Sequence, residues 1–353
     1  DTQMRTILDP VNPALLRQPF VSIFNHLQKG GGLKEYAYFR DYYIVTLDAT
    51  GQYSSSKKSC DECCVKTLAN GETSYYHQLL AAAIVHPDRK TVIPFAPEPI
   101  IKEKNASKND CELNAAKRLL VAIKKEHPRL KMVVVFDALY GNAPFIKLLI
   151  SLGFSYIIVA KGGDHQYLFD YINDKITKKE ATQLNIYEEA SKITREFLFV
   201  NHVPLNKSNP DVIVNFLEYK EVDENGKCLF YSTWITDIEL TAENVFHIMK
   251  CGRSRWKVEN EVFNTLKNLG YNFEHNYGHG EQHLATVLAM LMMLAFLIDQ
   301  VQECYCNLFR QAKNKFRTKS YLWLKMQSLF LSYFIEDWES FYLAIIHKYK
   351  PST

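Results

Sequence analysis

The sequence predicts a mixed α/β fold, in which a sheet carries helices on its faces. Up to about residue 160, short apolar runs typical of strands alternate with helical patterns in the order βββαβαβ. A β-rich segment follows, and from residue 241 onward the pattern is helical. We therefore expect a core with a β-rich insertion and a helical C-terminal region.

In the first half, residues 1–40 read as helix and loop. Asn70-Gly71 indicates a turn between strands, Asp110 is a helix cap, and Pro144 opens a second helix. The expected strands are 42–48, 75–85, 91–95, 132–137 and 156–160, and the expected helices are 110–128 and 144–152.

In the second half, Asn225-Gly226 is a strong hairpin signal. The expected strands are 196–203, 212–222 and 228–236, and the expected helices are 241–268, 281–302 and 305–348. This divides the chain into five regions: a lead-in (1–40), the first part of a core (41–164), an inserted β subdomain (165–240), the closing helices of the core (241–302) and a C-terminal helical region (303–353).

Composition indicates a globular protein, because 47% of its 353 residues are hydrophobic. A net charge of +3 is compatible with a polyanionic partner without requiring one. The longest apolar stretch, 284–298, is shorter than the roughly 20 residues of a membrane span, so we expect a buried core helix. Eight cysteines without a regular framework favour a reducing cytoplasm. Since the chain begins at Asp1 rather than Met, we expect a segment upstream.

Three acids stand where the patterns call for apolar residues. Asp48 and Asp137 each end an apolar strand run, and Glu259 lies on the apolar face that Trp256, Val262, Phe263 and Leu266 define. Burying a carboxylate is costly unless a cation compensates it, which points to a divalent metal. Glu261 falls on the opposite side of the helix, where Lys257 can pair with it.

Each acid also has a simpler interpretation. Arg255, one turn before Glu259, is an alternative ion-pair partner. An aspartate after an apolar run can merely end the strand or start a turn. Two further acids, Glu98 and Glu112, are interpreted as a loop-surface residue and a residue of a helix first turn.

The chain resembles the DDE transposases of bacterial insertion sequences. The resemblance rests on Leu47-Asp48-Ala49-Thr50-Gly51, on Val135-Phe136-Asp137, and on the run from Arg253 to Glu259 and on to Phe263 and Lys267. It implies an RNase H-like core interrupted by a β-rich insertion before the glutamate. It also implies that Asp48, Asp137 and Glu259 are the catalytic, metal-binding acids.

The family signature around the glutamate is Tyr, two residues, Arg, three residues, Glu, six residues, Lys. Arg255 and Glu259 fit, whereas Gly252 replaces the Tyr and Lys267 comes one position late. Arg255, Lys267 and Lys161 are candidates for phosphate contact. Trp234 is a candidate for stacking on a flipped DNA base, with a core position as the alternative.

By the resemblance, the acids would hold two Mg²⁺ ions about 3.5 to 4 Å apart, with Mn²⁺ as a substitute. Asp48 would contact both ions, and Asp137 and Glu259 one each. The attacking group would be water for cleavage and a DNA 3′-hydroxyl for strand transfer. The partners would be the transposon ends and target DNA, bridged by a homodimer in the bacterial cytoplasm. The alternatives are an RNase H-like nuclease or resolvase without strand transfer, and an inactive, domesticated DNA-binding relic.

Cys60-x-x-Cys63, with Cys64, His77 or Cys111 nearby, resembles half of a zinc site. Because no second pair shows regular spacing, we expect reduced, unliganded thiols, with structural zinc as the alternative. His77 is expected to pack within a strand. The segment containing His275, His279 and His283 is explained by a glycine-rich turn between helices.

Overall fold

A single mixed sheet runs through the molecule. The computed structural model describes residues 2–102 and 108–347, and eleven strands of these residues join in one sheet. Its main path has the order β2-β3-β1-β6-β7-β11-β10-β9-β8, and β4 and β5 pair with β3. The predicted mixed α/β fold is therefore confirmed.

The first part of the sheet is built around β1 (Tyr43–Ser55). It pairs antiparallel with β3 (Thr73–Val85) and parallel with β6 (Met132–Phe136), which in turn pairs parallel with β7 (Ser155–Val159). Three short strands extend the β3 side, namely β2 (Cys64–Thr67), β4 (Ile93–Pro94) and β5 (Glu98–Ile100).

The prediction that the first strand ends at Asp48 is wrong. β1 continues to Ser55 because its pairing with β3 persists along the whole hairpin. Its parallel pairing with β6, however, stops at Thr46. Asp48 thus lies where β1 separates from β6, and it is half-buried.

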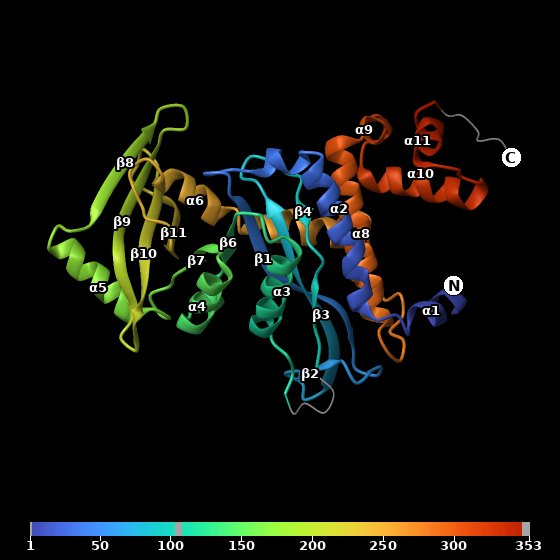
Figure 1. Ribbon diagram of the computed structural model, residues 1–353, viewed down its shortest axis with the longest axis horizontal. Coiled ribbons are helices and arrows are strands. Elements are labelled where there is room, and N and C mark those ends of the chain that lie inside the picture. The colour runs from blue at the N-terminus through green and yellow to red at the C-terminus, as the bar shows by residue number, and fades with distance from the viewer. Residues whose placement is uncertain (1, 103–107, 348–353) are drawn as a thin grey trace.

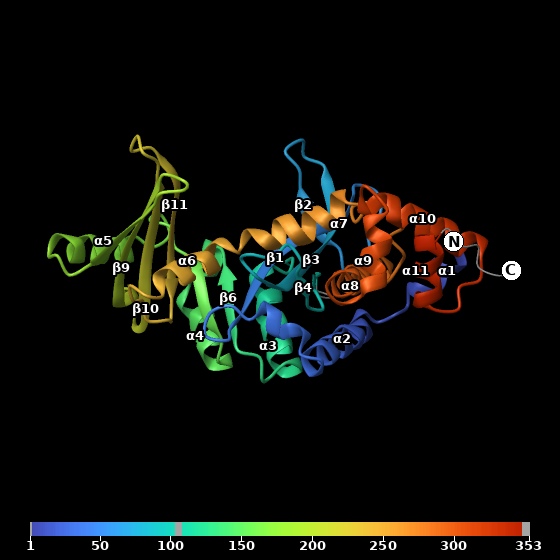
Figure 2. The ribbon, with the colours of Figure 1, turned by 90° about the horizontal axis from the view of Figure 1, so that it is seen from above.

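Helices cover both faces of this part of the sheet. Figure 2 shows α3 (Glu112–Glu126) and α4 (Ala143–Leu152) on one side, and a helical segment made of α6 (Val245–Arg253), η4 (Val258–Phe263) and α7 (Asn264–Asn268) crossing the other. Asn142 caps α4, because its side chain accepts a hydrogen bond from the Phe145 N–H.

The predicted helix 241–268 is interrupted by a turn at Ser254 and Arg255, and η4 has π-helical hydrogen bonding.

The β-rich segment continues the same sheet instead of forming a separate one. β11 (Cys228–Thr236) pairs antiparallel with β7, and β10 (Asn209–Val222), β9 (Ile193–Asn206) and β8 (Thr182–Glu188) follow. Gly226, with φ of 81°, forms the predicted turn between β10 and β11. The sequence analysis missed β8 and the helix α5 (Gln166–Thr177).

The C-terminal helices begin with α8 (Leu284–Tyr305), which is longer than its apolar stretch suggested. By length and composition α8 could cross a membrane, but its buried residues pack into the core beside β1, β3 and β4, as a core helix does. The predicted helix 305–348 is instead three helices, α9 (Asn307–Asn314), α10 (Lys319–Ser332) and α11 (Trp338–His347), with a small apolar cluster of their own. Residues 348 and beyond lie outside the described residues.

The N-terminal residues form short helices along α8. They are α1 (Thr2–Leu8), η1 (Pro13–Leu16), α2 (Arg17–Lys29) and η2 (Gly32–Tyr36). In Figure 1 these helices and α9–α11 lie toward one end of the molecule, and β8–β11 with α5 lie at the other. The edge between these ends, where β1 and β6 separate, carries the two predicted aspartates.

Candidate active site

Asp48 and Asp137 occupy equivalent positions on neighbouring parallel strands. The pairing between β1 and β6 ends with Thr46 and Val135. Asp48 follows Thr46 by two positions, and Asp137 follows Val135 by two positions. Residues two apart on a strand project from the same face. Both carboxylates therefore belong to one face and one edge of the sheet.

Asp137 also ends β6 and starts a turn. Its Oδ1 accepts a hydrogen bond from the Leu139 N–H at 3.0 Å, which caps the short helix η3 (Ala138–Tyr140). The turn-initiating interpretation is thus correct as local structure. It does not exclude a second role, because a carboxylate accepts several hydrogen bonds or ligands at once.

Asp48 lies in a strongly negative environment. Its pKa is raised to about 6, chiefly by burial and also by the carboxylates of Glu112 and Glu259, while the Ala49 N–H and Arg255 act in the opposite direction. Two acids distant in sequence thus approach Asp48 closely enough to disfavour its ionised form. This arrangement is the one that a divalent cation would stabilise.

Glu259 projects from the π-helical segment η4, which packs on β1 and β3. Arg255 Nη1 donates to Glu259 Oε1 at 2.8 Å, and its side chain is only 13% exposed. The ion pair considered as the alternative is therefore present. Because Arg255 also lowers the pKa of Asp48, its guanidinium serves two of the acids together.

Glu112, interpreted from the sequence as a residue of a helix first turn, is a fourth acid near Asp48. It opens α3, accepts a hydrogen bond from Tyr140 Oη at 2.7 Å, and has a pKa raised by burial and by Asp137. The interpretation as an ordinary first-turn residue is therefore incomplete. Helical phase would have found it, since it precedes the buried residues Ala115, Ala116 and Leu119 by three, four and seven positions.

The carboxylates do not form a closed cage. Among the described residues, no three of the four acids bring their oxygens as close together as the ligand atoms of Cys60, Cys63, His77 and His279, which lie within 4.8 Å of one another.

Trp256 does not share the buried face of Glu259's helix. It is 52% exposed, whereas Val262, Phe263 and Leu266 are buried, so its predicted core position is wrong. The reason is the π-helical hydrogen bonding of η4, which changes the helical phase between Trp256 and Val262. The guanidinium of Arg255 lies 4.4 Å from the centre of the exposed Trp256 ring.

Trp234 lies in the core, which was the alternative to its predicted role in stacking on a DNA base. It is 1% exposed, so its ring offers no face to a DNA base in this structure. A Cβ added to Gly252 would come within 2.7 Å of the Trp234 indole. Trp234 therefore fills the space beside position 252, where the family signature has Tyr. This explains why glycine, which has no side chain, occupies that position.

The late position of Lys267 has a structural counterpart in η4. A π-helical turn holds one residue more than an α-helical turn. Eight residues from Glu259 to Lys267 across η4 thus span two turns, as seven residues do in a regular helix. Leu266, at the nominal signature position, is buried, and Lys267 Nζ pairs with Glu274 Oε1 at 2.7 Å.

Lys161 follows β7 at the same edge of the sheet. Phe136 of β6 pairs with Ile158 of β7, so Asp137 corresponds to Val159, and Lys161 comes two residues later. Its side chain is exposed. The parallel strands β1, β6 and β7 thus present Asp48, Asp137 and Lys161 in order along one edge.

A separate cluster joins Cys60, Cys63, His77 and His279, whose ligand atoms all lie within 4.8 Å of one another. The expectation that His279 needs no partner beyond its glycine-rich turn is wrong. Sequence spacing gave no signal for it, because His279 lies 216 residues after Cys63.

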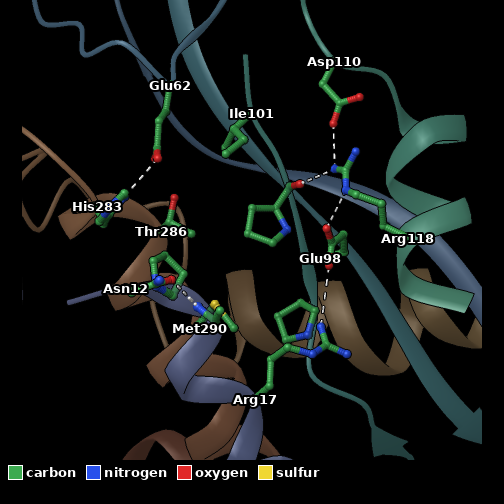
Figure 3. Close-up of a pocket in the computed structure, with 14 residues that line it drawn as sticks. Asn12, Arg17, Glu62, Glu98, Ile101, Asp110, Arg118, His283, Thr286 and Met290 are labelled. Atoms are coloured by element: carbon green, nitrogen blue, oxygen red, sulfur yellow. Dashed lines mark hydrogen bonds and ion pairs between the residues drawn. The ribbon is translucent and has the colours of Figure 1, made fainter. Parts of the chain in front are cut away.

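One pocket of the described residues is distinct from the acids. Figure 3 shows this cavity of about 290 Å³, and the residues lining it include none of Asp48, Glu112, Asp137 and Glu259. Glu98, expected on a loop surface, instead lies between Arg17 and Arg118 and forms ion pairs with both, at 3.6 and 2.7 Å. The interpretation of Glu98 as a surface residue is therefore wrong, and its role here is structural.

The family model described as the transposase DDE domain matches residues 60–297, more than half of the chain, so the chain belongs to this family of DDE transposases. The predicted RNase H-like fold agrees with this membership. The match begins after Asp48 and includes Asp137 and Glu259. The comparison with curated proteins gave no match.

Proposed function

We propose that this transposase cleaves DNA at the ends of a bacterial insertion sequence and joins them to target DNA in the cytoplasm. One observation carries the proposal: Asp48, on β1, has its pKa raised by burial and by the carboxylates of Glu112 and Glu259, at the edge where Asp137 ends the neighbouring strand. Concentrated negative charge at strand ends is the feature that a phosphoryl-transfer site with cations requires.

Asp48, Asp137 and Glu259 are the residues that would hold Mg²⁺. Their hard carboxylate oxygens are the ligands that this ion prefers, and a cation would compensate the burial that raises the pKa of Asp48. When bound, two Mg²⁺ ions supply Lewis-acid activation and charge neutralisation for displacement at phosphorus. Mn²⁺ is expected to substitute for Mg²⁺.

The protein's own contribution is to position these groups. Strand pairing sets the register of Asp48 and Asp137, and η4 packs on β1 with Glu259 close enough to Asp48 to raise its pKa. Arg255 orients Glu259 by its hydrogen bond and neutralises part of the negative charge before a cation arrives. The site is thus held by regular backbone structure, which keeps the carboxylate geometry fixed.

DNA phosphates are proposed to contact Arg255, Lys267 and Lys161. Lys161 is exposed beside the acids, and Lys267 lies two turns beyond Glu259. The exposed ring of Trp256, and not the buried Trp234, is the aromatic surface available to an unpaired base. We also propose that two copies of the chain bridge the two transposon ends, and that the regions 41–164 and 241–302 form the catalytic core around the insertion 165–240.

The test is a Mg²⁺-dependent assay of cleavage and strand transfer on DNA carrying the element's ends. Asp137→Asn should abolish both reactions while DNA binding and the thermal unfolding profile are retained. Glu261→Gln is the matched control, because Glu261 stands two residues from Glu259 on the same helical segment and is close to Lys257. Wild-type cleavage without joining would identify a nuclease or resolvase. No reaction in the wild type with either Mg²⁺ or Mn²⁺ would identify an inactive DNA-binding relic.

A further inference from the structure

We propose that Cys60, Cys63, His77 and His279 bind one structural Zn²⁺ ion. The four side chains come from three separate segments: the loop between β1 and β2, strand β3, and the connection between α7 and α8. Cys63, His77 and His279 are buried, with 2%, 2% and 9% exposure. This cluster is independent of the carboxylate site and uses the thiolate and imidazole ligands that zinc prefers.

Five of the six distances between the ligand atoms lie close to the edges of a tetrahedron around one zinc ion, and the sixth, between Cys60 Sγ and His279 Nε2, is within 4.8 Å. Bonds of about 2.3 Å to sulfur and about 2.0 Å to nitrogen imply edges of about 3.8 Å between sulfurs, about 3.5 Å between sulfur and nitrogen and about 3.3 Å between nitrogens. The Cys60 and Cys63 Sγ atoms are 3.8 Å apart, and the Nε2 atoms of His77 and His279 are 3.2 Å apart. His77 Nε2 lies 3.5 Å from Cys60 Sγ and 3.3 Å from Cys63 Sγ.

Hydrogen bonding does not explain this arrangement. His77 Nε2 lies within 3.5 Å of both sulfurs and of His279 Nε2. A single imidazole nitrogen carries one proton or one lone pair, so it cannot satisfy three partners at once. A common ion at the centre satisfies all of them.

Two backbone contacts around the cluster hold His279 and Cys63 in the forms that bind zinc. His279 Nδ1 lies 2.8 Å from the Gly280 carbonyl oxygen, which can only accept, so Nδ1 carries the proton and Nε2 presents its lone pair to the cluster. The Cys60 N–H donates to Cys63 Sγ at 3.4 Å, a bond that stabilises a thiolate. Both contacts orient the atoms that would bind the metal.

The ion would join the connection before α8 to the β1–β3 hairpin. His77 is paired with Tyr53 near the far end of that hairpin, and the Tyr53 ring lies 4.6 Å from the His279 ring. The connection is anchored independently by Asp9, whose carboxylate accepts from the N–H groups of Glu281, Gln282 and Leu284. Zinc would thus restrain the strand that carries Asp48 against the segment that follows Glu259.

The experiment is metal analysis of the full chain purified from zinc-supplemented cells, by mass spectrometry of the metal and by titration of free thiols. The expected result is one zinc per chain, a lower melting temperature after chelation, and recovery on adding zinc. Cobalt in place of zinc should give the strong visible absorption of a tetrahedral thiolate site.

Matched variants locate the ion. Cys63→Ala and His279→Gln should lose zinc. The neighbouring Cys64→Ala should keep it, because Cys64 Sγ points to the Ile100 carbonyl oxygen at 3.7 Å. His275→Gln should also keep it, because His275 is exposed on the same connection. Asp137→Asn should retain zinc, which separates this site from the catalytic one.

The proposal is overturned if the soluble wild-type protein carries no zinc and binds none on titration. It is also overturned if the wild type contains a Cys60–Cys63 disulfide in place of the metal, or if Cys63→Ala and His279→Gln both keep a full equivalent. The wild-type measurement decides the question even where a variant fails to fold.

Discussion

Asp48 and Asp137 lie in register on two neighbouring parallel strands, each two residues beyond Thr46–Val135, the last pair between β1 and β6. Neighbouring strands lie about 4.8 Å apart, so this register sets the spacing of the two carboxylates through the backbone. Arg255 and Glu259 approach from a helix on the sheet. The central claim is that this edge binds divalent metal and acts on DNA.

Glu112 is expected to strengthen metal binding without being essential. Glu112→Gln removes one negative charge near Asp48 and Asp137, so the Mg²⁺ concentration for half-maximal cleavage should rise about 10-fold, comparable to loss of an outer partner of a metal ligand. Tyr140→Phe keeps the charge and removes only the hydrogen bond to Glu112, so it should have a smaller effect. An unchanged Mg²⁺ dependence in Glu112→Gln would show that this acid is only structural.

The packing of Trp234 is expected to require glycine at position 252. Gly252→Ala places a Cβ 2.7 Å from the indole, and overpacking of this kind costs about 1–3 kcal/mol of unfolding free energy. Trp234→Leu combined with Gly252→Ala should show a favourable coupling in a double-mutant cycle measured by urea unfolding. Additive losses would contradict the direct contact.

Lys267 and Glu274 are expected to have opposite effects on DNA affinity. Lys267→Ala should weaken binding at every sequence and reduce the salt slope by about 1, as loss of one phosphate contact does. Glu274→Gln frees Lys267 from its 2.7 Å ion pair and should tighten binding. Both are measured by fluorescence anisotropy at several salt concentrations, and weaker binding by Glu274→Gln would argue against Lys267 as the contact.

Asp299 is expected to make stability depend on pH. Burial raises its pKa to about 6, above its ordinary value of 3.8, so the folded protein holds this proton more tightly than the unfolded chain. Its stabilising contribution is complete below about pH 4 and is lost as the pH rises through 6. Asp299→Asn should therefore raise the unfolding free energy at pH 7 by about 2 kcal/mol and flatten the profile between pH 4 and 7.

Urea unfolding at several pH values checks this expectation. The exposed Asp164 supplies the control, because Asp164→Asn should leave the profile unchanged. A parallel pH profile in Asp299→Asn and the wild type would assign the dependence to other groups.

The acids differ in how far the sequence could predict their positions. The apolar runs located Asp48 and Asp137 at one edge, although pairing with β3 carries β1 past Asp48. Helical phase separated Glu259 from Glu261, and the same reasoning applied to α3 would have included Glu112. The phase failed at Trp256, because it assumes regular α-helical spacing and the chain is π-helical from Val258 to Phe263.

Other features depend on contacts between distant segments. His279 reaches Cys63 across 216 residues through the packing of α8 beside the β1–β3 hairpin, and no local pattern encodes that approach. The extension of the sheet from β7 to β11 is likewise a tertiary pairing that two short apolar runs do not specify. The π-helical hydrogen bonding of η4 arises within a sequence that fits a regular α-helix equally well.

The most direct test of the central claim is a crystal structure of the wild-type protein soaked in MnCl₂, with anomalous diffraction to locate the metal. The account predicts manganese at the edge of the sheet, bound by carboxylate oxygens of Asp48 and Asp137 with Glu259 beside it, and its loss in Asp137→Asn. The absence of manganese at this edge, while Glu259 keeps its ion pair with Arg255, would contradict the account.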